Sequence, residues 1–204
     1  KMSSQGRRSR KTESLLKELE NLCSSDDLSL VTLLGKINPI PTDALYGSSF
    51  LHRVCSNKRV SVEIVEYILD LYPDAAQTTS EFLCPHHVQA ADFESYWQSI
   101  TPYPQCYPLH LACINGDCPN AVIELLVKEN NSALSHQCII GEGAEWGHYD
   151  SGYVRGLPLH YYLSRDANID LDMVKMIVEG HPDALTTADD ESGFTPLHSL
   201  MCNW

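Results

Sequence analysis

Apolar positions in this chain recur in pairs of short helical patterns that are separated by turn residues. The clearest unit spans residues 107–134. Pro108 suits the first turn of a helix, because its fixed φ fits that position and its missing N–H would have no helical partner there. Asn115 and Gly116 tolerate a left-handed conformation, which predicts that the first helix stops before them. A second amphipathic pattern begins at Asn120, so the unit is predicted to be a helix–turn–helix.

The same pattern recurs when His110 is used as a register mark. Equivalent histidines are His52, His160 and His198, and each of them follows a leucine. The copies cover about 45–76, 107–135 and 157–188, and the start of another lies at 195. A helix pair of this kind has an apolar face that only a neighbouring pair can cover. The sequence therefore predicts successive helix pairs that stack on one another.

A divergent pair is predicted at residues 12–44, ahead of the copies. Its first helix carries an apolar stripe, and Thr12 is its candidate N-cap. Its second helix is predicted to begin at Leu28, after a polar break at 24–27, and to end at Gly35. Because an end pair must present a polar outer face, we interpret 12–44 as an N-terminal capping repeat.

Two long insertions separate the copies, at about 77–106 and 135–157. The first is too apolar for a disordered linker, and a short helix is predicted within it at 90–100. The second combines five glycines with Trp146, Tyr149 and Tyr153, which predicts a flexible aromatic loop. Insertions of this length are often functional.

The segment Asp189–His198 reads DDESGFTPLH, which resembles the D-x-x-G-x-T-P-L-H junction of ankyrin repeats. Three P-L-H tripeptides and one F-L-H make the resemblance specific. It implies an all-α fold, an ankyrin-type helix-turn-helix repeat solenoid with two long loop insertions. Two features depart from the family pattern. Only the last copy keeps Thr before Pro, and the spacings of 58 residues (His52 to His110) and 50 residues (His110 to His160) exceed the usual repeat of about 33.

Charge is distributed unevenly along the chain. Residues 1–11 hold five of the 14 Lys and Arg residues and no acid, so residues 12–204 hold nine against 27 Asp and Glu, a net charge of −18. An acidic body repels phosphate backbones, which argues against nucleic acid as a partner. The basic, flexible head at 1–11 has two interpretations: a disordered tail, or a nuclear-import or anionic-surface patch. The chain starts without Met and stops nine residues into a copy, so we expect a fragment of a longer protein.

The chain is expected to be intracellular, either cytoplasmic or nuclear. No apolar run approaches 18 residues, so no membrane span is predicted, and no signal-peptide pattern opens the chain. Eight cysteines show no paired spacing, and two of them, Cys55 and Cys113, fall at core positions of the copies. We therefore expect eight reduced thiols.

Candidate chemistry is concentrated at Cys84, His86 and His87, with Cys106 at the other end of the first insertion. These are zinc-ligand types, but their spacing does not fit a Cys-x-x-Cys or His-x-x-x-His knuckle. The sequence carries no dinucleotide fingerprint, Walker lysine motif or nucleophile elbow, so no catalytic residue or cofactor is predicted. The register histidines are expected to tie each first helix to neighbouring backbone groups.

The resemblance implies a protein–protein interaction module or scaffold without catalysis, which binds another protein alone or as a subunit of a larger assembly. A metal-binding or enzymatic site on the insertions is the alternative. In the resembled family, partner choice lies at the end of the first helix and in the tips between copies. The corresponding positions here are Ser56, Asn57, Ile114, Asn115, Ser164, Arg165, Trp97, Trp146 and Tyr149.

Overall fold

The computed structural model describes residues 10–40, 49–79, 106–141, 153–165, 169–189 and 193–202, and most of these residues are helical. The α-helices of this part are α1 (Arg10–Cys23), α2 (Leu30–Ile37), α4 (Phe50–Cys55), α5 (Val62–Leu71), α7 (Pro108–Ile114), α8 (Asn120–Glu129), α9 (Pro158–Ser164), α10 (Leu171–Gly180) and α11 (Pro196–Cys202). Short 3-10 helices follow three of them: η1 (Pro73–Gln77), η3 (Asn131–Ser135) and η4 (Pro182–Leu185). The predicted helical class is confirmed.

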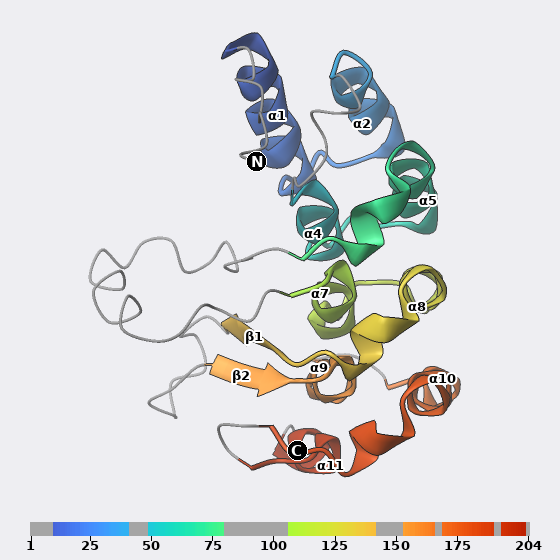
Figure 1. Cartoon of the computed structure of the whole chain (residues 1–204). Helices are drawn as coiled ribbons and strands as arrows, with labels where there is room; N and C mark the ends of the chain where they lie inside the picture. The colour runs from blue at the N-terminus through green and yellow to red at the C-terminus, as the bar shows by residue number, and fades with distance from the viewer. Residues whose placement is uncertain are drawn as a thin grey trace, which may run out of the picture.

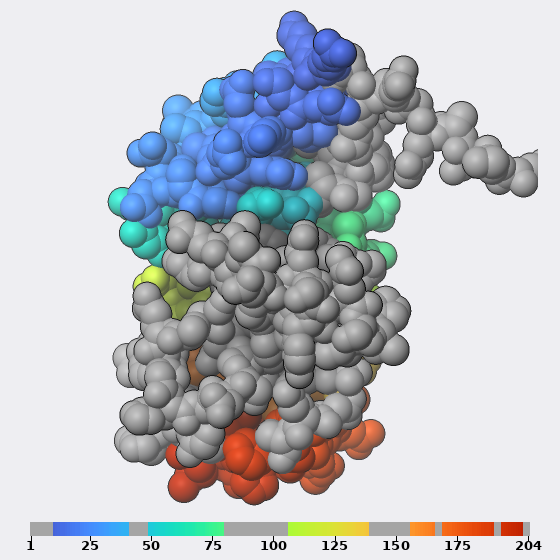
Figure 2. Space-filling view, turned by 90° about the vertical axis from the view of Figure 1, so that its left-hand side faces the viewer, coloured from blue at the N-terminus to red at the C-terminus, as the bar shows by residue number. Residues whose placement is uncertain are grey.

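The α-helices lie in two columns (Figure 1). In the inner column, α1, α4, α7, α9 and α11 contact one another in that order. In the outer column, α2, α5, α8 and α10 do the same. Each of the first four inner helices also contacts the outer helix that follows it in the chain. The coloured residues in Figure 2 follow the same order, from the N-terminal pair at one end to the C-terminal residues at the other.

One apolar core runs through both columns. A single cluster of buried residues reaches from Leu16 in α1 to Ala184 in η4. Its largest fully buried side chains come from both columns and include Leu19, Leu33, Phe50, Ile123 and Tyr161. Each helix pair therefore completes its burial only against the next pair, which couples the stability of neighbouring pairs.

Prolines and a capping box set the starts of several helices. Pro108, Pro158 and Pro196 each open an inner helix, where a proline needs no hydrogen-bond acceptor. In α2 the Ser29 hydroxyl accepts a hydrogen bond from the Thr32 N–H at 3.2 Å, and the Thr32 hydroxyl accepts one from the Ser29 N–H at 3.0 Å. This capping box satisfies two backbone N–H groups that have no acceptor within the helix.

Three predicted helix boundaries were wrong. α1 begins at Arg10, so Thr12 lies inside the helix and is not its N-cap. α2 begins at Leu30 rather than Leu28 and continues through Gly35 to Ile37. Burial explains the longer end, because Ile37 is 2% exposed and the last turn brings it into the core.

The structure corrects the prediction for the second insertion at both ends of that segment. Residues Cys138–Gly141 form β1 and Tyr153–Gly156 form β2, an antiparallel pair in which Cys138 lies opposite Gly156. These are the only strands in the part of the chain that the structure describes. The insertion is therefore a strand-based hairpin at its base rather than a loop throughout. The helix predicted at 90–100 lies outside the described residues.

Two acidic side chains have structural roles, one at a helix start and one in a turn. The Asp170 carboxylate accepts a hydrogen bond from the Asp172 N–H at 2.9 Å and caps α10. The Asp189 carboxylate accepts one from the Phe194 N–H at 3.2 Å, across a turn in which Gly193 has a φ of 71°. Among the described helices, none is both long and apolar enough to cross a membrane.

Candidate protein-binding stripe

The predicted partner-binding positions at the ends of the inner helices divide into two groups. Four residues after each register histidine stand Ser56, Ile114 and Ser164, and all three are half-buried. They belong to α7, α9 and the C-cap of α4, which stack in sequence, so they follow one another along the inner column. We call these three residues the inner stripe. The next residue is buried in two of the copies, Asn57 and Arg165.

The serines of the inner stripe bond back to their own helices. The Ser56 hydroxyl donates to the Arg53 carbonyl at 3.0 Å, and the Ser164 hydroxyl donates to the Tyr161 carbonyl at 3.1 Å. The Ser56 hydroxyl oxygen keeps acceptor capacity for a second group. Ile114 supplies an apolar surface between them. The inner stripe therefore consists of a small apolar side chain flanked by two serine hydroxyls.

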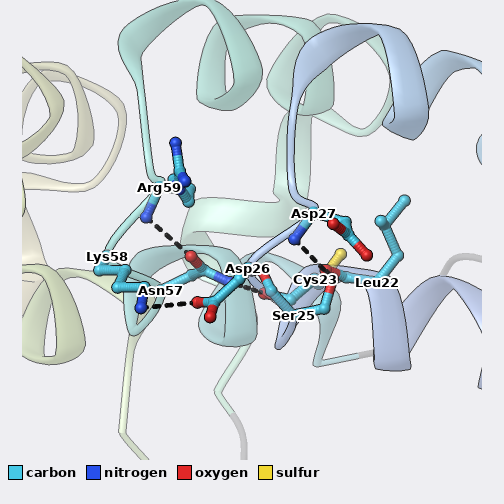
Figure 3. Close-up of polar contacts among 8 residues, drawn as sticks. All are labelled: Leu22, Cys23, Ser25, Asp26, Asp27, Asn57, Lys58 and Arg59. Atoms are coloured by element: carbon cyan, nitrogen blue, oxygen red, sulfur yellow. Dashed lines mark hydrogen bonds and ion pairs between the residues drawn. The ribbon is translucent and has the colours of Figure 1, made fainter.

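Asn57 links the first two helix pairs (Figure 3). Its amide nitrogen donates to the carbonyls of Cys23 at 3.0 Å and Ser25 at 2.8 Å, and its amide oxygen accepts from the Arg59 N–H at 2.7 Å. Beside it, the ammonium of Lys58 lies 2.8 Å from the carboxylate of Asp26. Asn57 is only 7% exposed. Asn57 was predicted to take part in partner choice, but in the structure its amide is buried and holds the turn and the preceding pair together.

Asn115 does the same one pair later. Its amide nitrogen donates to the carbonyls of Cys55 at 2.9 Å and Asn57 at 3.1 Å, and its amide oxygen accepts from the Asp117 N–H at 3.1 Å. The helix ends at Ile114, before Asn115, as predicted, but the left-handed conformation that Asn115 tolerates is not used, since its φ is −72°. The side chain, rather than a positive φ, closes the turn after α7.

Arg165 occupies the third equivalent position and is also turned inward. It is 6% exposed, and its guanidinium lies 4.0 Å from the centre of the Tyr162 ring. Its Nη2 donates to the Asn120 amide oxygen at 3.1 Å and to the Tyr162 hydroxyl at 3.0 Å. The side chain of Arg165 is therefore buried rather than exposed at the end of α9, and its part in partner binding stays a prediction. Cation–π stacking and hydrogen bonding hold it inside the structure.

The Tyr162 cluster is the feature that sequence analysis missed. The Tyr162 hydroxyl donates to the Asn120 amide oxygen at 3.2 Å, and the Asn120 amide nitrogen donates to the Asp170 carboxylate at 2.9 Å. Together with Arg165 these groups join α8, α9 and the start of α10. A signal was present in the register, because Tyr162 stands where the other copies have the apolar residues Val54, Ala112 and Leu200. A large polar side chain at a small core position needs polar partners nearby.

The register histidines hold backbone segments, as predicted. In His110 the Nδ1 accepts from the Tyr107 N–H at 3.2 Å and the Nε2 donates to the His136 carbonyl at 2.8 Å. In His160 the corresponding groups are the Leu157 N–H at 3.1 Å and the Phe194 carbonyl at 3.1 Å.

The other two register histidines, His52 and His198, form hydrogen bonds of the same kind. The His52 Nε2 donates to the Cys106 carbonyl at 3.0 Å, and the His198 Nδ1 accepts from the Thr195 N–H at 3.1 Å. Cys106 and Phe194 both stand two residues before the proline that opens the next inner helix. These bonds therefore fix the entry of the chain into that helix.

Burial keeps these imidazoles neutral at pH 7. Desolvation lowers the pKa of His52 and of His110 to about 4, although the carbonyl that each imidazole contacts favours the protonated form. Burial also lowers the pKa of His160. The three side chains thus act as neutral hydrogen-bonding groups inside the fold.

The described thiols are likewise core groups. Cys23, Cys55, Cys106, Cys113, Cys118 and Cys138 are all buried and form no disulfide among themselves. Burial raises the pKa of Cys23 and of Cys118 to about 12, so these two remain protonated at pH 7. The predicted count of eight reduced thiols also includes Cys84 and Cys202, whose side chains lie outside the described residues.

The candidate metal ligands are only partly described. Cys106 is 2% exposed and sits in the core beside His52. Cys84, His86 and His87 lie outside the described residues, as do Trp97, Trp146 and Tyr149. Within the described ranges, no three His, Cys, Asp or Glu side chains are grouped so that they could hold a metal ion. A comparison with protein-family models found no matching family, and a comparison with curated proteins found no match either.

Proposed function

We propose that this chain is an ankyrin-type repeat solenoid that binds another protein. In this proposal the inner column forms the concave side, and the inner stripe contacts the partner together with the two insertions. The chain acts as an interaction module or scaffold and does no chemistry of its own.

The observation that carries the proposal is the repetition of one set of contacts at one register. In successive pairs the histidine binds backbone that leads onward in the chain, and the residue five positions later binds neighbouring groups. The residue between them stays half-exposed in all three pairs. The polar side chains at these two register positions form hydrogen bonds within the fold. The half-buried positions between them are the ones that we propose for recognition.

The composition of the inner stripe supports partner recognition. An apolar centre with polar neighbours is the usual composition of a protein interface. Trp146 and Tyr149 of the second insertion are of the residue types that most often anchor interfaces. β1 and β2 pair at the base of that insertion, and β2 contacts α9. In this proposal the insertion therefore extends from a fixed position on the inner column.

The test is a capture experiment with matched variants of the full chain. Wild type, Ser164→Arg and Val31→Arg are immobilised, and the proteins that each retains from an extract of the source cell are identified by mass spectrometry. Ser164 belongs to the inner stripe, whereas Val31 is 79% exposed on the outer helix α2. We expect the same partner with wild type and Val31→Arg, and its loss with Ser164→Arg.

Two checks make the result interpretable. Thermal unfolding of both variants is compared with wild type, so that a loss of capture by Ser164→Arg, at a half-buried position, is not mistaken for a loss of stability. Trp146→Ala should weaken binding of the captured partner by more than about 1 kcal/mol. Equal capture by wild type and both variants, together with an unchanged affinity for Trp146→Ala, would rule out this surface.

A further inference from the structure

Two side-chain amides join successive helix pairs, and only one of them is followed by glycine. The Asn57 amide binds carbonyls of the preceding pair, and the next residue is Lys58 (Figure 3). The Asn115 amide does the same one pair later, and the next residue is Gly116. The difference is chemical, because the backbone nitrogen that follows an Asn can attack its side-chain amide. Glycine has no Cβ and leaves that nitrogen the most accessible.

The reaction is an intramolecular deamidation. Base removes the proton of the Gly116 N–H, the nitrogen attacks the Asn115 Cγ, and a five-membered succinimide ring closes. The bond between Cγ and Nδ2 breaks, and the amide group takes a proton from solvent and leaves as ammonia. Water then opens the ring at either carbonyl, which gives aspartate or isoaspartate at position 115. Gly116 is exposed, so solvent reaches this turn.

The folded backbone is far from the geometry that this reaction needs. Ring closure requires the Gly116 nitrogen and the Asn115 Cβ to eclipse each other across the Cα–C bond. This corresponds to a ψ of about −120°, which lies outside the main allowed regions for a residue with a side chain. The ψ of Asn115 is 105°. The nitrogen therefore points away from the group that it would attack, and such a geometry makes the reaction slow.

The side chain of Asn115 is fixed as well. Its Nδ2 donates to the carbonyls of Cys55 at 2.9 Å and Asn57 at 3.1 Å, and its Oδ1 accepts from the Asp117 N–H at 3.1 Å. The two bonds of Nδ2 exist only while α4 and α7 stay in contact. Separation of these pairs, or unfolding, frees both the amide and the backbone of the turn.

The product no longer fits the joint between the two pairs. A carboxylate at position 115 has no N–H to donate, so the carbonyls of Cys55 and Asn57 lose their donor and face a negative charge. Isoaspartate also adds one atom to the backbone at this turn. Neither product can restore the contacts that Asn115 makes.

We propose that Asn115 and Gly116 form a latent deamidation site, which the stacked fold keeps unreactive and whose conversion irreversibly weakens the joint between α4 and α7. A chain that unfolds and deamidates does not regain its full stability when it refolds. The inference goes beyond the proposed function and does not depend on the inner stripe.

Protection by the fold is tested on wild type in mildly alkaline buffer, with and without guanidinium chloride at an unfolding concentration. Peptide mapping by mass spectrometry follows the conversion of Asn115. We expect it to be at least about tenfold faster in the denaturant. Gly116→Lys is the control, because it gives Asn115 the successor that Asn57 has. In the denaturant its Asn115 should react at least about tenfold more slowly than that of wild type, whether or not the variant folds.

The consequence is tested with Asn115→Asp, which is one of the two products, and with the control Asn131→Asp at an exposed position. In urea denaturation, Asn115→Asp should lower the equilibrium constant for folding at least about tenfold, and the control should change it by less than about threefold. Equal conversion of Asn115 with and without denaturant would overturn the protection by the fold. Equal stability of the two variants would overturn the weakening of the joint.

Discussion

Side-chain amides at the turns connect helix pairs that are distant in the sequence. The bonds of Asn57 reach 34 and 32 residues back, and those of Asn115 reach 60 and 58. A sequence pattern shows that both residues stand in turns, where Asn is common. It cannot show which carbonyls they meet, because those belong to another pair. This is why the sequence did not show that Asn57 and Asn115, both predicted to take part in recognition, bind the preceding pair.

Replacing Asn115 should therefore cost stability. Asn115→Ala removes two hydrogen bonds to carbonyls of the preceding pair and the acceptor for the Asp117 N–H. We expect a loss of about 1–3 kcal/mol in the free energy of unfolding, measured by urea denaturation. Asn131→Ala, at an exposed position, is the control and should change it by less than about 0.5 kcal/mol. Equal effects would mean that the amide does not join the pairs.

At the scale of elements, Gly35 and Gly180 affect their helices in different ways. Gly35 was predicted to end its helix, yet α2 passes through it, since burial of Ile37 outweighs the low helix propensity of one glycine. Gly180 ends α10 at a close approach, where an added Cβ would meet the Leu134 side chain and lie 3.0 Å from the Asn131 amide oxygen. Helix propensity is local, whereas this contact depends on tertiary packing.

One substitution at the two glycines should have opposite effects. Around Gly35 an added Cβ meets no atom within 4 Å, so Gly35→Ala should raise the free energy of unfolding by about 0.5–1 kcal/mol. Gly180→Ala should lower it by about 1–3 kcal/mol, because the buried Leu134 would have to move. Thermal and urea unfolding measure both changes. A stabilising Gly180→Ala would contradict the packing of α10 against η3.

The whole molecule repeats one buried histidine along the inner column, which makes its stability depend on pH. His52 and His110 have a pKa of about 4 when folded, below the value of about 6.5 that an unfolded chain gives. Between these values the unfolded state binds protons that the folded state does not. The free energy of unfolding therefore falls as pH drops from about 6.5 towards 4.

His110→Gln isolates one contribution to this dependence. The variant should be less stable at pH 7, because it loses the imidazole contacts to Tyr107 and His136. Its loss of stability between pH 6.5 and pH 4 should, however, be smaller than that of wild type by on the order of 3 kcal/mol. Urea unfolding at a series of pH values gives both slopes. Parallel curves would show that His110 is not buried in the neutral form.

Continuity of the core gives a second prediction for the molecule as a whole. Leu126 of α8 and Leu109 of α7 are each 1% exposed within the single apolar cluster. Leu126→Ala and Leu109→Ala should each cost about 2–5 kcal/mol, measured by urea denaturation. Leu171→Ala is the control, because Leu171 is 78% exposed on α10 and should cost less than about 1 kcal/mol. Unfolding unaffected by both core changes would contradict the stacked arrangement.

The sequence by itself determined the helices, their order and the residues that mark the register. Apolar spacing, Pro at helix starts and polar breaks act over a few residues, so they can be followed along the chain. The register also predicted the backbone contacts of His110 and His160. Tertiary structure alone decided which side of each inner-helix end faces outward: Ser164 stays half-exposed while its neighbour Arg165 is buried on Tyr162. The reason is that the exposure of a side chain depends on groups from other helix pairs. A local sequence pattern does not show how close those groups lie.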